Sequence, residues 1–435
     1  MKHLFFSVFI SLSFSAHSLV IPDNYRGGVE ICTEKKDTRE FGIWLDVPVD
    51  YNNPSRGLTN LFAWTKKPFD PSKKTLIFVS GGPGDTAHKS SLEISDWNVV
   101  FFDQRGIACS RPSTRELYLD RTFYSSEFIA HDMEQVRKEL KVDKISVYGV
   151  SYGTVPAHLY GHFYPEATRA VVLEGIVYQG GEGLIRPERT VRNLQSFFDS
   201  LSIDIQNRIL EISERSDVAA NWFSNVGNMM LYMDDFANVF LTFLNNILWN
   251  DSIAVPMLKS FESKDQMDEE YYFGHVMMGM IGCQELGMNQ SGLSFHSVFK
   301  DKKLISDEFN DMQKFYCESL GFEPDEKTSY YSAINYPSSS FTTYIQGSTD
   351  GATSQDEASL HFNHATIGSR QFLLVDKGGH APLHGPVSSG YEKGDGLELR
   401  LNILKEALSG KKISYQSLKN ISQFLKFEWN LTSRN

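Results

Sequence analysis

Three residues, Ser151, Asp350 and His380, have the types and the order that nucleophilic catalysis by a serine requires. Ser151 lies in the segment GVSYG (149–153), which matches the pattern G-x-S-x-G. A serine hydroxyl needs a histidine as general base, and the histidine needs an acid that orients it. Asp350 and His380 follow Ser151 in the chain order serine, acid, histidine that accompanies this motif. The set predicts acyl transfer through a covalent intermediate at Ser151.

The G-x-S-x-G pattern is short, and its sequence context strengthens it. The apolar segment 144–150 predicts a buried strand directly before Ser151, and segment 154–164 predicts a helix directly after it. The pattern is typical of a strand-to-helix turn that is so tight that the neighbours of the serine must be small. At the start of a helix the serine also gains from free backbone N–H groups and from the helix dipole.

Other residues could take the roles of the acid and the base. Glu174 ends the strand-like segment after Ser151 and is the main rival of Asp350, and His384 is the main rival of His380. A further interpretation is that Asp350 and His380 are ordinary polar residues in loops. Two aspartates fit the acid role less well, because one falls deep in a helix-like segment and the other is only four residues from His380: Asp356 and Asp376.

An oxyanion hole requires two backbone donors near the nucleophile. The N–H group of Tyr152, directly after the serine, is the first candidate. The second should come from the glycine-rich loop 80–86, which follows another apolar strand-like segment. Pro83 has no N–H group, so Gly82 is the favoured donor and Gly81 the second choice. A phosphate-binding role for this loop is disfavoured, because the sequence contains no G-x-x-x-x-G-K-[ST] motif.

The elements that must position these residues alternate between apolar strands and helices in the first part of the chain. Such alternation implies an α/β fold class with a mostly parallel sheet that helices cover on both faces. Helix-like spacing is clearest at 131–141 and 154–164. The strand-like segments are 41–49, 59–67, 74–80, 96–103, 144–150 and 168–177.

The pattern becomes largely helical from about residue 180 to 337. Strand-like segments then return at 339–350 and 370–380, and a helix-like segment follows at 396–408. We therefore expect an α/β core domain over 19–179 and 338–435, interrupted by a mainly helical cap domain over 180–337.

Composition and charge exclude some classes of function. Hydrophobic residues form 41% of the chain and charged residues 22%, as in soluble globular proteins. The formal net charge of −12 argues against nucleic-acid binding, which needs a basic face. His158 and His162 have a spacing that could bind a metal ion, but no third ligand is evident, so a core or helix-surface role is favoured. We expect no metal and no cofactor.

The first 18 residues resemble a secretory signal peptide. Lys2 precedes an apolar run over 4–14, and Ala16 and Ser18 fit a cleavage site with small residues. The run is too short to span a bilayer, and stable membrane insertion is not expected. We therefore expect an exported protein, periplasmic or extracellular; a buried N-terminal strand is the alternative.

Four cysteines permit two disulfides in an exported chain. We favour Cys283–Cys317, because both residues fall in the cap region, which leaves Cys32–Cys109 as the second pair. Four reduced cysteines are the alternative.

Three motifs in chain order resemble the proline iminopeptidase and tripeptidyl aminopeptidase family of α/β hydrolases. They are SGGPGDT (80–86), DQRGIACSRP (103–112) and GVSYGT (149–154), where the family carries HGGPG, DQRGxGxS and GxSxG. Two positions depart from the family pattern, Ser80 and Ala108, and they shape the pocket rather than the triad. Further segments look like parts of the secreted tripeptidyl branch and of the histidine loop: 45–54, 281–285 and 376–383.

The resemblance implies an α/β-hydrolase fold, with a cap inserted after the strand that follows the nucleophile helix. It implies a serine aminopeptidase that removes one or a few residues, of prolyl or tripeptidyl type, from short peptides with a free N-terminus. Such an enzyme must recognise an ammonium group. Glu285, in an apolar stretch beside Cys283, is the main candidate, and Glu174 is the second. A salt bridge or a solvated helix face is the other interpretation of Glu285.

Two other functions remain open on the same residues. A carboxylesterase, or another hydrolase of small esters or amides, would use the same triad, because a fold does not fix a substrate. A binding protein without catalysis fits less well, since it would not need the ordered serine, acid and histidine.

Overall fold

The computed structural model describes residues 25–34, 41–87, 90–180, 187–219, 222–259, 269–290, 316–324, 326, 330–385, 394–426 and 428–434. All residues predicted for the site fall within these ranges. The predicted signal peptide over 1–18 lies outside the described residues.

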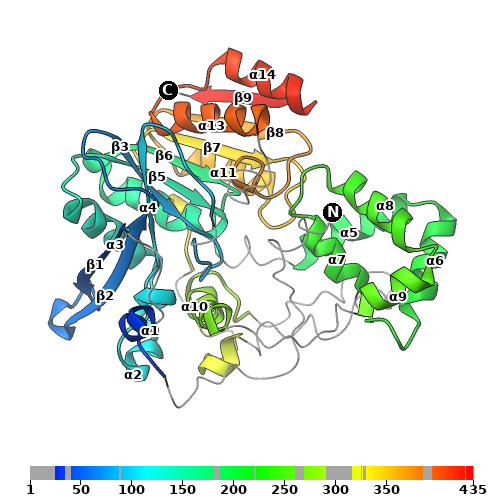
Figure 1. Ribbon diagram of the computed structural model, residues 1–435, viewed down its shortest axis with the longest axis horizontal. Helices are drawn as coiled ribbons and strands as arrows, with labels where there is room; N and C mark the ends of the chain where they lie inside the picture. Colours follow the sequence, from blue (N-terminus) through cyan, green and yellow to red (C-terminus); the bar gives the residue numbers. More distant parts are fainter. Residues whose placement is uncertain are drawn as a thin grey trace.

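A nine-stranded sheet forms the centre of the molecule, in the order β1-β2-β4-β3-β5-β6-β7-β8-β9 (Figure 1). The strands from β3 to β8 pair in parallel, and β1, β2 and β9 pair antiparallel at the two edges. The mostly parallel sheet is therefore confirmed. The strands are β1 Phe41–Pro48, β2 Leu58–Thr65, β3 Lys74–Val79, β4 Trp97–Phe102, β5 Ile145–Val150, β6 Thr168–Glu174, β7 Thr342–Gly347, β8 Arg370–Val375 and β9 Trp429–Arg434.

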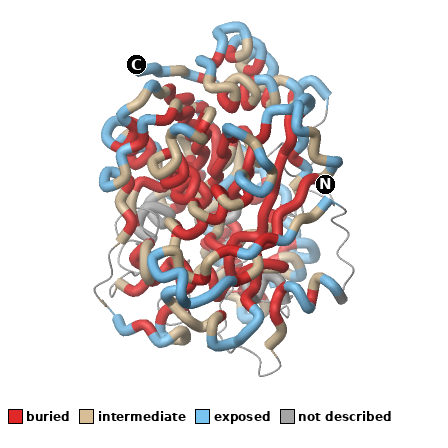
Figure 2. The backbone as a smooth tube through the Cα atoms, turned by 90° about the vertical axis from the view of Figure 1, so that its left-hand side faces the viewer, coloured by how far each residue is buried: buried red, intermediate tan, exposed pale blue. Residues whose placement is uncertain are grey.

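Helices cover both faces of the sheet. On one face, α3 (Ser126–Glu139), α4 (Thr154–Phe163) and α11 (Gln355–His364) contribute to one apolar cluster. On the other face, α13 (Asp395–Leu408) and α14 (Tyr415–Leu425) contribute to a second. Because both faces are covered, the central strands are almost entirely buried, and Figure 2 shows buried strands in the interior of the molecule.

In its described residues, the segment between β6 and β7 carries six α-helices and has two parts. Helices α5 to α9 pack around their own apolar cluster, and Figure 1 shows them as a group beside the sheet. Helix α10 instead places Val276, Met280 and Ile281 in a cluster of the sheet domain. The helices are α5 Pro187–Ser200, α6 Ile203–Ser213, α7 Trp222–Met230, α8 Phe236–Ile247, α9 Asp251–Lys259 and α10 Glu269–Glu285.

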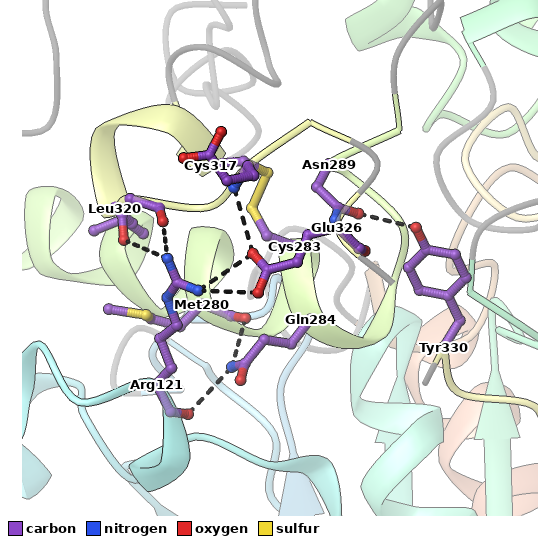
Figure 3. The surroundings of a disulfide bond; sticks show 11 residues. Arg121, Met280, Cys283, Gln284, Asn289, Cys317, Leu320, Glu326 and Tyr330 are labelled. Atoms are coloured by element: carbon purple, nitrogen blue, oxygen red, sulfur yellow. Dashed lines mark hydrogen bonds and ion pairs between the residues drawn. A yellow bond between two sulfur atoms is a disulfide. The ribbon is translucent and has the colours of Figure 1, made fainter. Parts of the chain in front are cut away.

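Both favoured cysteine pairs form disulfides. Cys32–Cys109 joins α1 (Gly28–Glu34) to the loop after β4, and α2 (Arg115–Tyr118) follows that loop. Cys283–Cys317 joins the end of α10 to a short turn (Figure 3). Beside this bond Arg121 pairs with Glu326 at 3.3 Å, which attaches the α10 region to the sheet domain.

No helix in the described parts of the chain has both the length and the apolar character that a membrane crossing requires.

Candidate active site

Ser151 lies on a tight turn between β5 and α4. Its φ of 57° is in the left-handed region, which residues other than glycine rarely adopt. A Cβ atom on Gly149 would lie 2.1 Å from the carbonyl oxygen of Gly153, and one on Gly153 would lie 2.3 Å from that of Val79. Larger residues would therefore clash on either side of Ser151. The strained turn is typical of a nucleophile lifted out of the carboxyl edge of a sheet.

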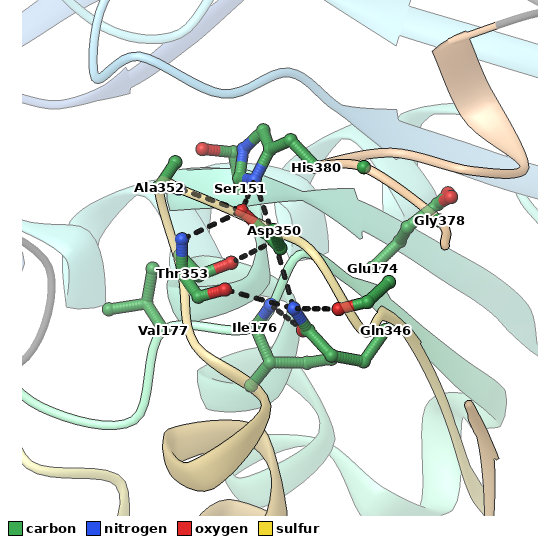
Figure 4. Close-up of polar contacts among 12 residues, drawn as sticks. Ser151, Glu174, Ile176, Val177, Gln346, Asp350, Ala352, Thr353, Gly378 and His380 are labelled. Atoms are coloured by element: carbon green, nitrogen blue, oxygen red, sulfur yellow. Dashed lines mark hydrogen bonds and ion pairs between the residues drawn. The ribbon is translucent and has the colours of Figure 1, made fainter. Parts of the chain in front are cut away.

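His380 and Asp350 follow the adjacent strands β8 and β7 and form a close pair. His380 Nδ1 lies 2.9 Å from Asp350 Oδ2 and 3.0 Å from Oδ1. The other ring nitrogen, Nε2, is buried and forms no hydrogen bond with any described residue. Figure 4 shows Ser151 next to His380, with Asp350 beside the same ring. The sequence order serine, acid, histidine therefore becomes a spatial cluster.

Asp350 is held as a carboxylate by several donors. Its oxygens accept hydrogen bonds from Gln346 Nε2 at 2.9 Å, from Ala352 N at 2.8 Å, and from the N–H and hydroxyl of Thr353 at 2.9 and 2.7 Å. Burial alone would raise the pKa of Asp350. The charge of His380 and the hydrogen bonds from His380 and Thr353 outweigh it and hold the pKa below its ordinary value.

The pKa of His380 is shifted in the opposite direction. Burial opposes the charged form of the ring, but the attraction of Asp350 outweighs it, and Glu174 and Asp85 add smaller contributions. The pKa of His380 is therefore above its ordinary value. A ring that gains a proton readily, and that is oriented by a carboxylate, suits a general base.

Glu174, the rival acid, lies at the end of β6 and contacts the backbone of the histidine loop. One carboxylate oxygen accepts from the N–H of Leu383 at 2.5 Å and from that of His384 at 3.1 Å. The hydroxyl of Tyr148 donates to the other oxygen. Complete burial raises the pKa of Glu174 to about 7, although these hydrogen bonds and the charge of Arg400 lower it. The structure thus brings Asp350, and not Glu174, to the ring of His380.

The rival base His384 is packed among aromatic side chains. Its ring stacks on Phe78, with centroids 4.7 Å apart, and meets the edge of Tyr148. Burial lowers the pKa of His384 to about 3. The two further aspartates are exposed, one in α11 and one after β8: Asp356 and Asp376.

The glycine-rich loop after β3 lies directly against the nucleophile. A Cβ atom on Gly81 would lie 3.0 Å from the Cβ atom of Ser151. Gly82 has a φ of 99°, and a Cβ atom there would lie 2.6 Å from the backbone nitrogen of Gly84. The N–H group of Tyr152 belongs to the first turn after β5, whose N–H groups have no partner within the helix. The oxyanion-hole roles of Gly82 and Tyr152 stay predictions.

Two residues of the DQRG segment, Gln104 and Arg105, form hydrogen bonds that hold the loops near the site in place. The sequence alone did not assign a role to either of them. Gln104 Nε2 donates to the carbonyl oxygen of Ser80 at 3.1 Å and so holds the start of the glycine loop. Arg105 is fully buried and donates to both oxygens of Asp132 at 2.9 and 2.7 Å. It also donates to the carbonyl oxygen of Val49 at 3.1 Å. The DQRG motif marked these two residues in the sequence, but their hydrogen-bond partners lie far from them along the chain.

Glu285 ends α10 and binds the first turn of α3. Its Oε1 accepts from the N–H of Ser126 at 2.9 Å, and its Oε2 accepts from the Ser126 hydroxyl. The same hydroxyl lies 2.8 Å from that of Tyr152, the neighbour of Ser151. Burial raises the pKa of Glu285 to about 7, although the hydrogen bonds from Ser126 lower it. The substrate-binding roles of Glu285 and Glu174 stay predictions.

His158 and His162 each contact a backbone carbonyl group. His158 Nε2 lies 2.8 Å from the carbonyl oxygen of Tyr336, and His162 Nδ1 lies 2.9 Å from that of Pro337. Both rings therefore attach α4 to the segment that leads into β7.

The sheet order, the strained serine turn and the strand-end pair define an α/β-hydrolase fold. Residues 74–204 match the family described as "alpha/beta hydrolase fold". Among solved structures, a proline iminopeptidase-related protein from Thermus thermophilus is 14% identical with a TM-score of 0.40, covering 85% of this chain and 98% of that one.

Two curated relatives carry names of peptidases. A probable proline iminopeptidase of Leptolyngbya boryana is 29% identical over 132 residues, which cover 27% of this chain. Serine protease Hip1 of Mycobacterium tuberculosis is 26% identical over 210 residues, which cover 37% of this chain. The chain spans 40% of the length of each of these relatives.

Proposed function

We propose that this protein is an exported serine aminopeptidase that releases one or a few residues from the free N-terminus of short peptides. The observation that carries the proposal is the cluster of Ser151 on its strained turn, His380 beside it and Asp350 on Nδ1 of His380. The names of the two curated relatives support peptide bonds as the target. The two disulfides support an oxidising compartment, periplasmic or extracellular.

The mechanism follows from the geometry of the site. Nε2 of His380 takes the proton of Ser151 as Oγ attacks the peptide carbonyl carbon. The N–H groups of Tyr152 and Gly82 stabilise the negative oxygen of the tetrahedral intermediate. The protonated His380, held by Asp350, then donates its proton to the leaving amine, and an acyl-enzyme remains. Water releases the acyl group by the same steps in the same order.

Contacts between the inserted segment and the site support a preference for chain ends. The ring of Tyr232, which precedes α8, lies 5.0 Å from that of His380. At the other side α10 approaches the glycine loop so closely that a Cβ atom on Gly84 would lie 2.2 Å from the carbonyl oxygen of Gly274. Covering elements on two sides of a nucleophile restrict access for long chains.

A panel of substrates tests the proposal against ester hydrolysis. It compares alanyl, prolyl and trialanyl p-nitroanilides, their N-acetylated forms, and p-nitrophenyl acetate. We expect kcat/KM to be at least about tenfold higher for the free amines, because a charge-assisted contact contributes about 1.5–3 kcal/mol. Equal turnover of free and acetylated peptides would contradict an aminopeptidase, and turnover of the ester alone would favour an esterase. Activity retained in Ser151→Ala would exclude Ser151 as the nucleophile.

A further inference from the structure

Asp85 places a carboxylate next to the nucleophile. A Cβ atom on Gly81 would lie 3.0 Å from Ser151 Cβ and 3.5 Å from Asp85 Oδ2. One on Gly82 would lie 3.4 Å from Asp85 Cγ. The carboxylate and the serine side chain are therefore neighbours of the same short stretch of glycine backbone.

The turn around Asp85 is fastened by hydrogen bonds. The hydroxyl of Ser80 donates to the carbonyl oxygen of Asp85 at 2.6 Å, and the N–H of Asp85 is 3.4 Å from the carbonyl oxygen of Gly81. Gln104 Nε2 lies 3.1 Å from the carbonyl oxygen of Ser80. Ser80 is one of the positions that depart from the family pattern. Here it closes the turn that presents Asp85.

The carboxylate of Asp85 is half-buried, and no described residue donates a hydrogen bond to it or forms an ion pair with it. Burial raises the pKa of Asp85, and the charge of His380 opposes this shift. An anion that is partly removed from water is costly unless a cation approaches it.

Two roles in the hydrolytic step do not suit Asp85. Asp350 already occupies Nδ1 of His380, so Asp85 is not needed to orient the ring. A carboxylate cannot donate to an oxyanion and would repel it. A cationic group of the substrate is the ligand that such a carboxylate can stabilise.

We propose that Asp85 binds the substrate's ammonium group within one residue of the scissile carbonyl, which favours the release of single residues. The inference rests on the proposed aminopeptidase function and deepens it. In a substrate with one acyl residue, the free amine is two bonds from the carbonyl carbon that Ser151 attacks. In a tripeptide the amine lies about 7 Å farther along the chain, since each residue spans about 3.5 Å.

Glu285 is placed for a more distant role. Its oxygens accept from the N–H and hydroxyl of Ser126, and the side chain of Tyr152 lies between this contact and the nucleophile. Gly274 of α10 touches the glycine loop at Gly84, and Glu285 follows eleven residues later in the same helix. That separation is about 16 Å along the helix axis, so Glu285 lies far along α10 from the point where this helix meets the loop that carries Asp85.

Two asparagine variants test the inference with three substrates. Asp85→Asn removes the charge beside Ser151, and Asp143→Asn removes one from an exposed residue before β5, at the opposite edge of the sheet. We expect Asp85→Asn to lower kcat/KM at least about tenfold for alanyl p-nitroanilide and at most about threefold for trialanyl and N-acetylalanyl p-nitroanilide. Asp143→Asn should change none of them more than twofold, a margin of about 0.4 kcal/mol. Equal losses on all three substrates, or no loss, would overturn the inference.

A binding measurement separates this inference from the proposed function. In Ser151→Ala protein, calorimetry compares alaninamide, which carries the ammonium group, with N-acetylalaninamide, which does not. We expect alaninamide to bind at least about tenfold more tightly, and Asp85→Asn or Asp85→Ser to abolish the preference. Thermal unfolding confirms that each variant is folded. If the wild type cleaves no peptide, the proposed function fails, while an unchanged preference in both Asp85 variants would overturn the role of Asp85.

Discussion

Two carboxylates at the ends of neighbouring parallel strands have different environments. Asp350, after β7, is hydrogen-bonded to Nδ1 of His380 and accepts further hydrogen bonds from Gln346 and Thr353. Glu174, at the end of β6, accepts hydrogen bonds from backbone N–H groups of the histidine loop and from a tyrosine hydroxyl. The pKa of Asp350 lies below its ordinary value, and that of Glu174 is raised to about 7.

The difference shows that the position after a strand does not by itself assign a role. Both acids reach the same loop, but one binds the ring of His380 and the other binds the backbone after it. We therefore infer that Asp350 orients the base and remains ionised, whereas Glu174 holds the loop in place. Substitutions of these two acids should therefore have different effects on catalysis and stability.

The largest effect is expected for Asp350→Asn. Loss of the carboxylate leaves the ring of His380 in the wrong tautomer and removes the charge that stabilises its protonated form. We expect kcat to fall about 10³- to 10⁴-fold, as for a removed triad acid. Steady-state kinetics with alanyl p-nitroanilide measure it, and the exposed Asp356→Asn, in α11, is the matched control. A loss of similar size in Glu174→Gln and a small one in Asp350→Asn would exchange the two roles.

Glu174→Gln should have an intermediate effect. We expect kcat to fall roughly tenfold, because the amide keeps one acceptor for the loop and the loss is about one charged hydrogen bond.

The stability of the protein should also respond to Glu174→Gln. The pKa of Glu174 rises from 4.5 in the unfolded chain to about 7 in the folded protein. Its contribution to stability is therefore present below pH 4.5 and is lost as pH rises through about 7, a change of about 3 kcal/mol. Urea unfolding at pH 5 and pH 7 should show that the variant lacks this part of the pH dependence. An unchanged difference between the two pH values would contradict the buried environment of Glu174.

The smallest effect is a shift of the pH profile. His380 must be neutral to accept the proton of Ser151, so kcat/KM should fall as pH drops below its raised pKa. Removing either negative charge should move this acidic limb to lower pH, and Asp350→Asn should move it farther than Glu174→Gln. An equal shift in the two variants, or a shift to higher pH, would show that the limb reports another group.

Much of the fold and of the site could be predicted from local patterns. The apolar runs predicted the parallel strands, and the glycines around Ser151 predicted the tight turn. The edge strand β9 was not predicted, because its residues are mostly polar and exposed. The choice between Asp350 and Glu174 stayed open, because the donors to Glu174 come from residues 26 and 209 positions away. Asp85 belongs to the segment SGGPGDT, but only the folded path of this loop brings its side chain close to Ser151.

Covalent labelling by a fluorophosphonate, which reacts with an activated serine, tests the role of Ser151 most directly. We expect one adduct on Ser151, located by peptide mass spectrometry, with labelling much slower in Asp350→Asn than in Glu174→Gln. An adduct on another residue, or labelling of Ser151→Ala at the wild-type rate, would contradict the central role of Ser151.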